Sequence, residues 1–287
     1  GRNVVPFALS GDGSIVAGQL QDRITSTSSA FVRNASGTVV DIGRLASDQN
    51  SGVLGLSRDG RVAVGTSFTN PGANYSARAF RWTAQEGMRQ LPGSQPLHDE
   101  VIAQATSADG SVVVGYSANL NGTDFADGFV WRNGVSTALP ERDGFADALG
   151  VSGDGRYVVG ITGAISTAVR WDLVTGEMLE LTGGGMNLRR AEAVSDDGRV
   201  VVGGVQIWRE GIGAQRVADY IAEAGFTLPP GAGVASVNGV SADGQTVVGT
   251  LGFGIGRSPR AFVFTIPAPS SALAVGLLCL MASRRRR

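Results

Sequence analysis

The residues of this chain that could do chemistry are six aspartates in one recurring motif. Ser-x-Asp-Gly, followed by four residues and a second Gly, occurs six times in 287 residues. Carboxylates bind a metal ion when several of them converge on it. Successive motif aspartates instead lie 43 to 50 residues apart in equivalent positions. We therefore predict that they cap turns rather than bind metal. They are Asp12, Asp59, Asp109, Asp154, Asp197 and Asp243.

Few other residues are candidates for catalysis or ligand binding. The single histidine, His98, lies beside two acids in the string GSQPLHDE, and no nucleophile motif accompanies it and Ser94. We interpret His98 as a surface-loop residue. Acidic stretches at residues 122–128 and 141–150 are interpreted as solvated loops. We identify no catalytic residue, no metal site and no cofactor, and the ligand-binding residues stay unknown.

Composition excludes several classes of protein. With 43% hydrophobic and 17% charged residues, the chain is not of the intrinsically disordered class. The net charge of -1 gives no electrostatic footprint for nucleic acid. A single Cys cannot form an internal disulfide framework. The 43 glycines, about twice the usual frequency of ~7%, point to many tight turns.

The elements that must position the aspartates are short strands. Each Asp-Gly is followed by a Val-rich apolar run bounded by Gly, which is typical of a buried strand after a tight turn. A second apolar element recurs at residues 30–33, 79–82, 128–131, 168–171, 205–208 and 261–264. It carries Trp82, Trp131, Trp171 and Trp208, which we interpret as packing residues. A third element ends at Leu91, Leu139 and Leu181 in three of the repeats, and a fourth apolar element precedes the Ser-x-Asp-Gly motif. Each repeat therefore offers four candidate strands.

The repeat length predicts the architecture. A four-stranded unit of about 46 residues matches a propeller blade, whose faces are buried by stacking neighbours radially. We predict an all-β, six-bladed β-propeller over residues 1–266, made of four-stranded blades. The last repeat lacks an outer strand, so we expect residues 2–6 to pair beside residues 261–264 and close the ring. Residues 216–230 form an insertion in the fifth repeat with Val217, Tyr220, Ile221 and Ala224 at helical spacing, which predicts a short amphipathic helix ending at Gly225.

The sequence changes character over residues 267–287. An uncharged, mostly apolar stretch of 11 residues at 272–282 precedes four terminal arginines. As a helix it would span only ~16 Å of a bilayer core of ~30 Å. The adjacent positive charge would hold that end in the cytoplasm. The tail therefore predicts a short hydrophobic helix with a sorting or anchoring role.

This tail resembles the PEP-CTERM sorting signal of exosortase-bearing bacteria. The residues that carry the likeness are Pro267, Ala268 and Pro269, where the family has Pro-Glu-Pro, and Arg284, Arg285, Arg286 and Arg287. The resemblance implies transient insertion of the tail into the inner membrane, cleavage by an exosortase-type enzyme, and release of the body outside the cell. No charged and apolar leader opens the chain, so we expect that a signal peptide was removed or that the start is truncated.

The repeats over residues 8–264 resemble the HAF-type extracellular repeats in their Ser-x-Asp-Gly, Val-Val-Gly and Ala-Phe-x-Trp strings. Taken together, the sequence predicts an exported, non-enzymatic propeller at the cell surface or in the extracellular matrix, binding polysaccharide or protein through its loops. One alternative is a secreted glycan hydrolase or lyase with a site in the central channel. Another is a purely structural surface protein.

Overall fold

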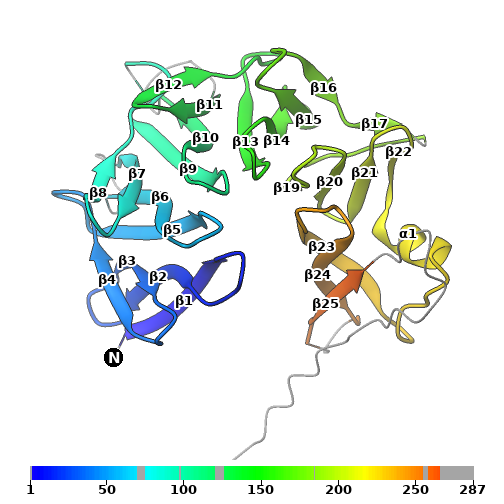
Figure 1. Cartoon of the computed structure of the whole chain (residues 1–287), viewed down its shortest axis with the longest axis horizontal. Helices are drawn as coiled ribbons and strands as arrows, with labels where there is room; N and C mark the ends of the chain where they lie inside the picture. The colour runs from blue at the N-terminus through cyan, green and yellow to red at the C-terminus, as the bar shows by residue number, and fades with distance from the viewer. Residues whose placement is uncertain are drawn as a thin grey trace, which may run out of the picture.

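The strands follow one another around an incomplete ring (Figure 1). The computed structural model describes residues 2–69, 75–96, 98–119, 126–183, 185–254 and 258–265. The predicted tail, with its apolar helix and terminal arginines, lies outside these residues. No helix within the described ranges is long and apolar enough to cross a membrane.

The strands group into units that correspond to the sequence repeats. Strands within a unit are antiparallel, and one parallel bridge, between Ala77 and Glu100, joins the second and third units into an eight-stranded sheet. The first unit contains β1 (Arg2–Leu9), β2 (Val16–Asp22), β3 (Thr27–Arg33) and β4 (Val39–Gly43), and the second contains β5 (Asn50–Leu56), β6 (Val62–Phe68), β7 (Ala77–Thr83) and β8 (Gly87–Gln90). The third contains β9 (Glu100–Thr106), β10 (Val112–Ala118), β11 (Asp127–Arg132) and β12 (Val135–Ala138), and the fourth contains β13 (Ala146–Val151), β14 (Tyr157–Thr162), β15 (Thr167–Asp172) and β16 (Met178–Glu180). A ribbon of β17 (Thr182–Gly183) and β18 (Met186–Asn187) precedes the fifth unit, β19 (Ala193–Val194), β20 (Val200–Gly203), β21 (Gln206–Arg209) and β22 (Gly213–Arg216). The sixth has three described strands, β23 (Gly233–Val240), β24 (Thr246–Gly252) and β25 (Arg260–Thr265).

Each motif aspartate lies in the turn between the first two strands of its unit, in one recurring arrangement. In the third unit, Ser107 Oγ donates to Asp109 Oδ1 at 2.6 Å and accepts from Val112 N–H at 3.0 Å. Asp109 Oδ1 also accepts from Ser111 N–H at 3.0 Å, and Gly110 has a φ of +72°. The other five turns repeat these three bonds. The carboxylate and hydroxyl therefore close the hairpin.

The position of the second Gly in the motif must be glycine, because the main chain of the neighbouring strand leaves no room for a Cβ atom. A Cβ on Gly115 would lie 1.8 Å from the main-chain oxygen of Ile102 in the neighbouring strand. A Cβ built on each equivalent glycine would lie 1.9 to 2.1 Å from a main-chain oxygen of the first strand or, for Gly203, of Arg190 just before it: Gly18, Gly65, Gly160, Gly203 and Gly249. Only a residue without a side chain lets these two strands pair at that point.

The apolar core lies between neighbouring units. Val112, Val114 and Val130 of the third unit, for example, pack against Val158 and Trp171 of the fourth. Four similar clusters join the other consecutive pairs. Trp171 and Trp208 are 1% and 5% exposed, and Trp82 and Trp131 are half-buried against clusters. Each unit thus buries its faces on its neighbours.

The predicted clasp between the two ends of the chain is wrong. Residues 2–6 begin β1 and pair with β2, with Arg2 opposite Asp22 and Pro6 opposite Gly18. In the described structure, β25 pairs only with β24. The physical reason is locality, because the hairpin through the first turn closes a few residues, whereas the clasp would close a loop of the whole chain.

The predicted helix is confirmed. Helix α1 (Val217–Glu223) buries Val217, Tyr220 and Ile221, as its apolar spacing indicated. Gly225 follows with a φ of +83°, a conformation that favours glycine after a helix. The helix covers the outer side of the interface between the fifth and sixth units, where Tyr220 packs edge-on against Phe264.

Candidate functional site

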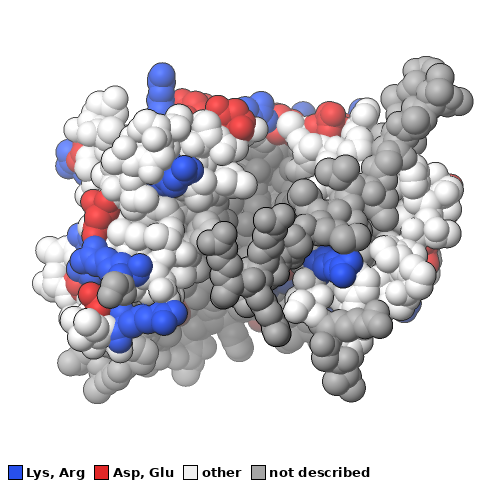
Figure 2. Space-filling model, turned by 90° about the horizontal axis from the view of Figure 1, so that it is seen from below, with Lys and Arg blue, Asp and Glu red and all other residues white. Residues whose placement is uncertain are grey.

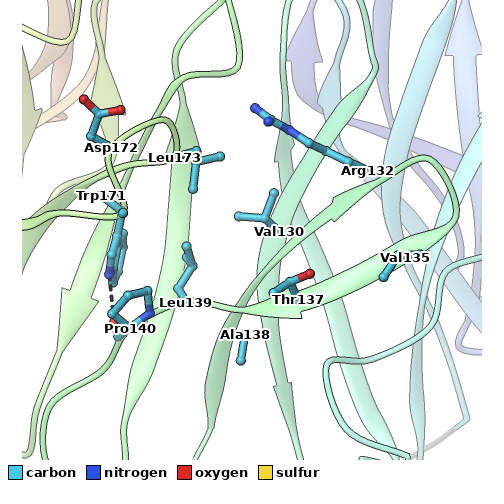
Figure 3. Close-up of a pocket in the computed structure, with 11 residues that line it drawn as sticks. Val130, Arg132, Val135, Thr137, Ala138, Leu139, Pro140, Trp171, Asp172 and Leu173 are labelled. Atoms are coloured by element: carbon cyan, nitrogen blue, oxygen red, sulfur yellow. Dashed lines mark hydrogen bonds between the residues drawn. The ribbon is translucent and has the colours of Figure 1, made fainter.

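The first candidate site is a groove at the outer edge of the third and fourth units, which we name the rim groove. It has a volume of about 290 Å³ (Figure 3). One wall comes from β11, β12 and the two residues after β12, and the other comes from the end of β15 and the turn after it. The lining residues are Val130, Arg132, Val135, Thr137, Ala138, Leu139, Pro140, Trp171, Asp172, Leu173 and Gly176.

Strand register places the first wall. Val130 pairs with Thr137 and Arg132 pairs with Val135, so these four side chains share one face of the sheet. The apolar floor is fixed by Trp171, whose indole N–H donates to the Pro140 carbonyl oxygen at 2.8 Å (Figure 3). Because Trp171 is almost fully buried, the groove offers an apolar hollow rather than an exposed aromatic face.

Opposite charges flank the upper end of the groove. Figure 3 shows Arg132 and Asp172 on opposite sides of it. Arg132 Nη2 donates to the Gly155 carbonyl oxygen, which holds the guanidinium in place. Hydrogen bonds from Arg156 and from the N–H of Val174 lower the pKa of Asp172 to about 2, so it is ionised at neutral pH. Asp172 is paired with Arg156 at 2.7 Å, so this end of the groove is polar, which suits an apolar side chain whose own backbone or neighbours are polar.

The six motif aspartates do not converge. Each lies in its own turn, and the described residues contain no group of three or more His, Cys, Asp or Glu that could hold a metal ion. The turns are linked through the variable residue of each motif, which is the x of Ser-x-Asp-Gly. A series of bonds runs from Gly11 N to Arg58 O, Arg58 N to Ala108 O, Ala108 N to Gly153 O, Gly153 N to Asp196 Oδ1, and Asp196 N to Ala242 O.

Two of these variable residues carry charge and pair with each other. Arg58 of the second unit and Asp196 of the fifth form an ion pair at 2.7 Å, although 138 residues separate them. A Cβ on Gly153 would lie 2.3 Å from Asp196 Oδ1 and 2.9 Å from Arg58 Nη2. The small residue at Gly153 therefore makes room for the pair. This contact could not be predicted from the sequence, because it depends on which units face each other.

The second cavity, which we name the His98 pocket, lies between the second and third units. Its volume is about 500 Å³, and it is lined by Ser76, Ala77, Arg78, Gln90, Pro92, Gly93, Ser94, Gln95, Pro96, His98, Asp99 and Val101. His98 lies in a loop, as expected, but it is half-buried and bonded to the buried Ser117. No sequence motif indicates this contact, because Ser117 lies on β10, outside the loop that carries His98.

One buried acid also escaped the sequence analysis. Burial raises the pKa of Asp147, on β13, to about 6, although Arg190 partly offsets this. Its Oδ1 has no hydrogen-bond partner among the described residues. Asp147 lies outside the rim groove and the His98 pocket. Its side chain can hold a proton near neutral pH, but it faces neither of the two cavities.

Charges on the face seen in Figure 2 are mixed. Seen from below relative to Figure 1, basic and acidic side chains are interspersed and do not form a patch of one sign (Figure 2). A nucleic-acid interface usually presents a continuous basic stripe. This face has no such stripe among its described residues.

No protein-family model and no curated protein matches the chain. Among solved structures, a prolyl endopeptidase is similar at 13% identity and a TM-score of 0.59, over 97% of this chain and 42% of that one. The β-propeller domain of the Trilobed protease from Pyrococcus furiosus is similar at 13% identity and a TM-score of 0.54, over 93% and 82%. TolB from Acinetobacter baumannii aligns at 16% identity and a TM-score of 0.49, over 84% and 52%. This chain thus spans about half of TolB and less of the endopeptidase. The mostly-β fold is that of β-propeller proteins.

Proposed function

We propose that this chain is an exported binding module, a six-bladed β-propeller that presents the rim groove to a protein ligand at the cell surface or in the extracellular matrix. The observation that carries the proposal is the apolar hollow over Leu139 and Trp171, flanked by Arg132 and Asp172. The propeller fold of the similar structures supports it, because rigid rings commonly hold binding surfaces. Export rests on the resemblance of the tail, with an exosortase-type enzyme as its processing partner.

The chemistry of the groove favours protein over polysaccharide as the ligand. Its walls are mainly aliphatic, so they offer few hydrogen bonds to the hydroxyl groups of a sugar. An apolar side chain from a protein segment would fill the hollow and remove its surface from water. A glycan-processing enzyme and a purely structural protein are the alternatives.

Filling the groove should abolish binding. A peptide-display library and a glycan array are screened against the chain, and selected peptides are expected to carry a large apolar anchor residue. Thr137→Trp should weaken the selected peptides at least tenfold, because the new ring occupies the hollow. Val40→Trp is the matched control, since Val40 pairs with Val32 as Thr137 pairs with Val130. Equal loss in both variants, binding to glycans alone, or turnover of any glycan would count against the proposal.

Six blades are proposed because the contacts between consecutive turns follow one pattern five times. The sixth contact of this pattern, between the last turn and the first, is not made by the described residues. The first glycine of a turn packs on a side chain of the preceding unit: Gly60 on Ile15, Gly110 on Val62, Gly155 on Val112, Gly198 on Tyr157 and Gly244 on Val200. Gly13 of the first turn has nothing within 4 Å. Among the described residues, no hydrogen bond continues the turn series from Ala242 to Gly11. We infer that Thr246 and Ala242 supply these contacts when the ring closes.

Spin-label distances test this closure. Labels are attached at Ser14→Cys and Gln245→Cys, two residues after the motif aspartates of the first and sixth turns, in a Cys279→Ser background. The control pair, Ser14→Cys with Arg61→Cys, spans two turns that are already in contact. A closed ring should give the same distance distribution for both pairs. A clearly longer distance between residues 14 and 245 would show that the ring stays open.

A further inference from the structure

A chain of four side chains runs from the third unit to the His98 pocket. Ser94 Oγ donates to Asp127 Oδ2 at 2.8 Å, and Ser94 Oγ and Ser117 Oγ are 2.8 Å apart. Ser117 Oγ also accepts from Ser94 N–H at 3.2 Å and lies 2.8 Å from His98 Nδ1. Ser117 is fully buried. Its hydroxyl therefore joins β10 to the loop that carries Ser94 and His98, and Ser94 extends the network to Asp127 on β11.

The protons of this network can be assigned by counting. Ser94 has one hydroxyl proton, which it uses for the hydrogen bond that it donates to the Asp127 carboxylate. The proton between the two serines must then come from Ser117. Ser117 has no further proton to donate, so His98 Nδ1 must carry the hydrogen and donate it to Ser117. In the neutral imidazole, Nε2 is consequently a bare acceptor.

This arrangement is specific to the third unit. Ser67 and Thr162 occupy the positions equivalent to Ser117, and they accept from the N–H of Leu45 and Arg142, respectively. Both donate their proton to a main-chain carbonyl oxygen, of Asn50 and of Phe145. Capping the loop therefore needs neither a histidine nor a second serine. In the third unit, Ser94 and Asp127 extend the network, and together with Ser117 they fix the tautomer of His98, which lines a cavity.

We propose that the His98 pocket is a second binding site for a neutral, polyhydroxylated ligand of the saccharide class, and that His98 Nε2 accepts a hydrogen bond from one of the ligand's hydroxyl groups. The pocket combines polar side chains, such as Ser76, Gln90 and Gln95, with the aliphatic surfaces of Pro92 and Val101. This mixture suits a molecule with hydroxyl groups on an apolar ring. The volume of about 500 Å³ is in the range of small-ligand sites.

Charge in the pocket favours a neutral ligand over an anion. Arg78, its one lining cation among the described residues, is paired with the buried Asp48 at 2.7 Å. Arg78 Nη2 also donates to the Ala46 carbonyl oxygen. The Asp48 carboxylate thus balances the charge of the Arg78 guanidinium, and Asp99 adds a carboxylate to the lining of the pocket. This site is separate from the rim groove, so either proposal can fail without the other.

The single histidine makes the test direct. In the full chain labelled with ¹⁵N-histidine, a long-range ¹H–¹⁵N spectrum contains one imidazole, and we expect the tautomer protonated at Nδ1. Methyl glycosides of glucose, galactose, mannose and N-acetylglucosamine are then added, and at least one should shift the Nε2 resonance. The Nε2-protonated tautomer, or no shift with any of the four, would overturn the proposal.

Variants separate binding from folding. Ser117→Ala should weaken the responding glycoside about tenfold, the loss expected for one well-placed hydrogen bond. Ser94→Ala should do the same while leaving the buried β10 unchanged. Thr162→Ala, the equivalent change in the fourth unit, and Thr137→Trp in the rim groove should leave the shift intact. Equal losses in Thr162→Ala and Ser117→Ala would reduce the network to loop capping and refute the site.

Discussion

Replacing Gly115 by Ala is expected to destabilise the chain by about 3 kcal/mol, near the upper end for overpacking in a close-packed interior. The new Cβ would lie 1.8 Å from the main-chain oxygen of Ile102, a separation that real Cβ atoms essentially never show. The strands cannot easily part, because β10 is bonded on one side to β9 and on the other to β11. Urea unfolding followed by circular dichroism measures the loss.

Gly233→Ala is the matched control for this substitution. Gly233 also lies in a strand, but a Cβ there would meet nothing within 4 Å, and its φ is not in the left-handed region. Its free energy of unfolding should change by less than about 0.5 kcal/mol. If both variants lose the same stability, the close approach at the second motif glycine is not what constrains the repeat.

Removing the hydroxyl of Ser107 should cost about 2 kcal/mol of unfolding free energy, the penalty for leaving a buried N–H without its acceptor. Ser107 is fully buried, and its oxygen serves both Asp109 and the N–H of Val112. Ser111→Ala is the control in the same turn. The Ser111 hydroxyl also bonds Asp109, at 2.8 Å, but it is exposed, so its loss should cost less than about 0.5 kcal/mol.

The same turn predicts a dependence on pH. The Ser107 hydroxyl, together with the N–H and hydroxyl of Ser111, lowers the pKa of Asp109 from 3.8 to about 2. Stability from this carboxylate is therefore present above pH 3.8 and is lost as the pH falls towards 2. The difference in unfolding free energy between the unsubstituted chain and Ser107→Ala should therefore narrow as the pH falls from 3.8 towards 2. A constant difference would show that Asp109 does not act through its charge.

Local features of this fold could be predicted from the sequence because they depend on neighbours in the chain. The Ser-x-Asp-Gly spacing brings a hydroxyl and a carboxylate onto one turn, and Gly110 supplies the positive φ. The helical spacing of Val217, Tyr220 and Ile221 likewise needed only a local apolar face. Contacts between units could not be predicted in this way. The clasp failed because β1 found a partner in the adjacent β2.

The candidate sites show the same division. His98 and Ser94 stand close in the sequence, yet Ser117 and Asp127, which assign the proton of His98, come from two other strands. The rim groove joins β12 to residues that follow β15, and no pattern within either segment marks it.

The repeat, its turns and the strands that the turns connect can be predicted from the order of the amino acids, since they follow from hydrogen bonds and burial over a few residues. Which units meet, where they separate into cavities, and that Arg58 reaches Asp196 emerge in the folded chain. Side chains distant in sequence interact only after the sheets have packed, and packing depends on the shapes of whole faces.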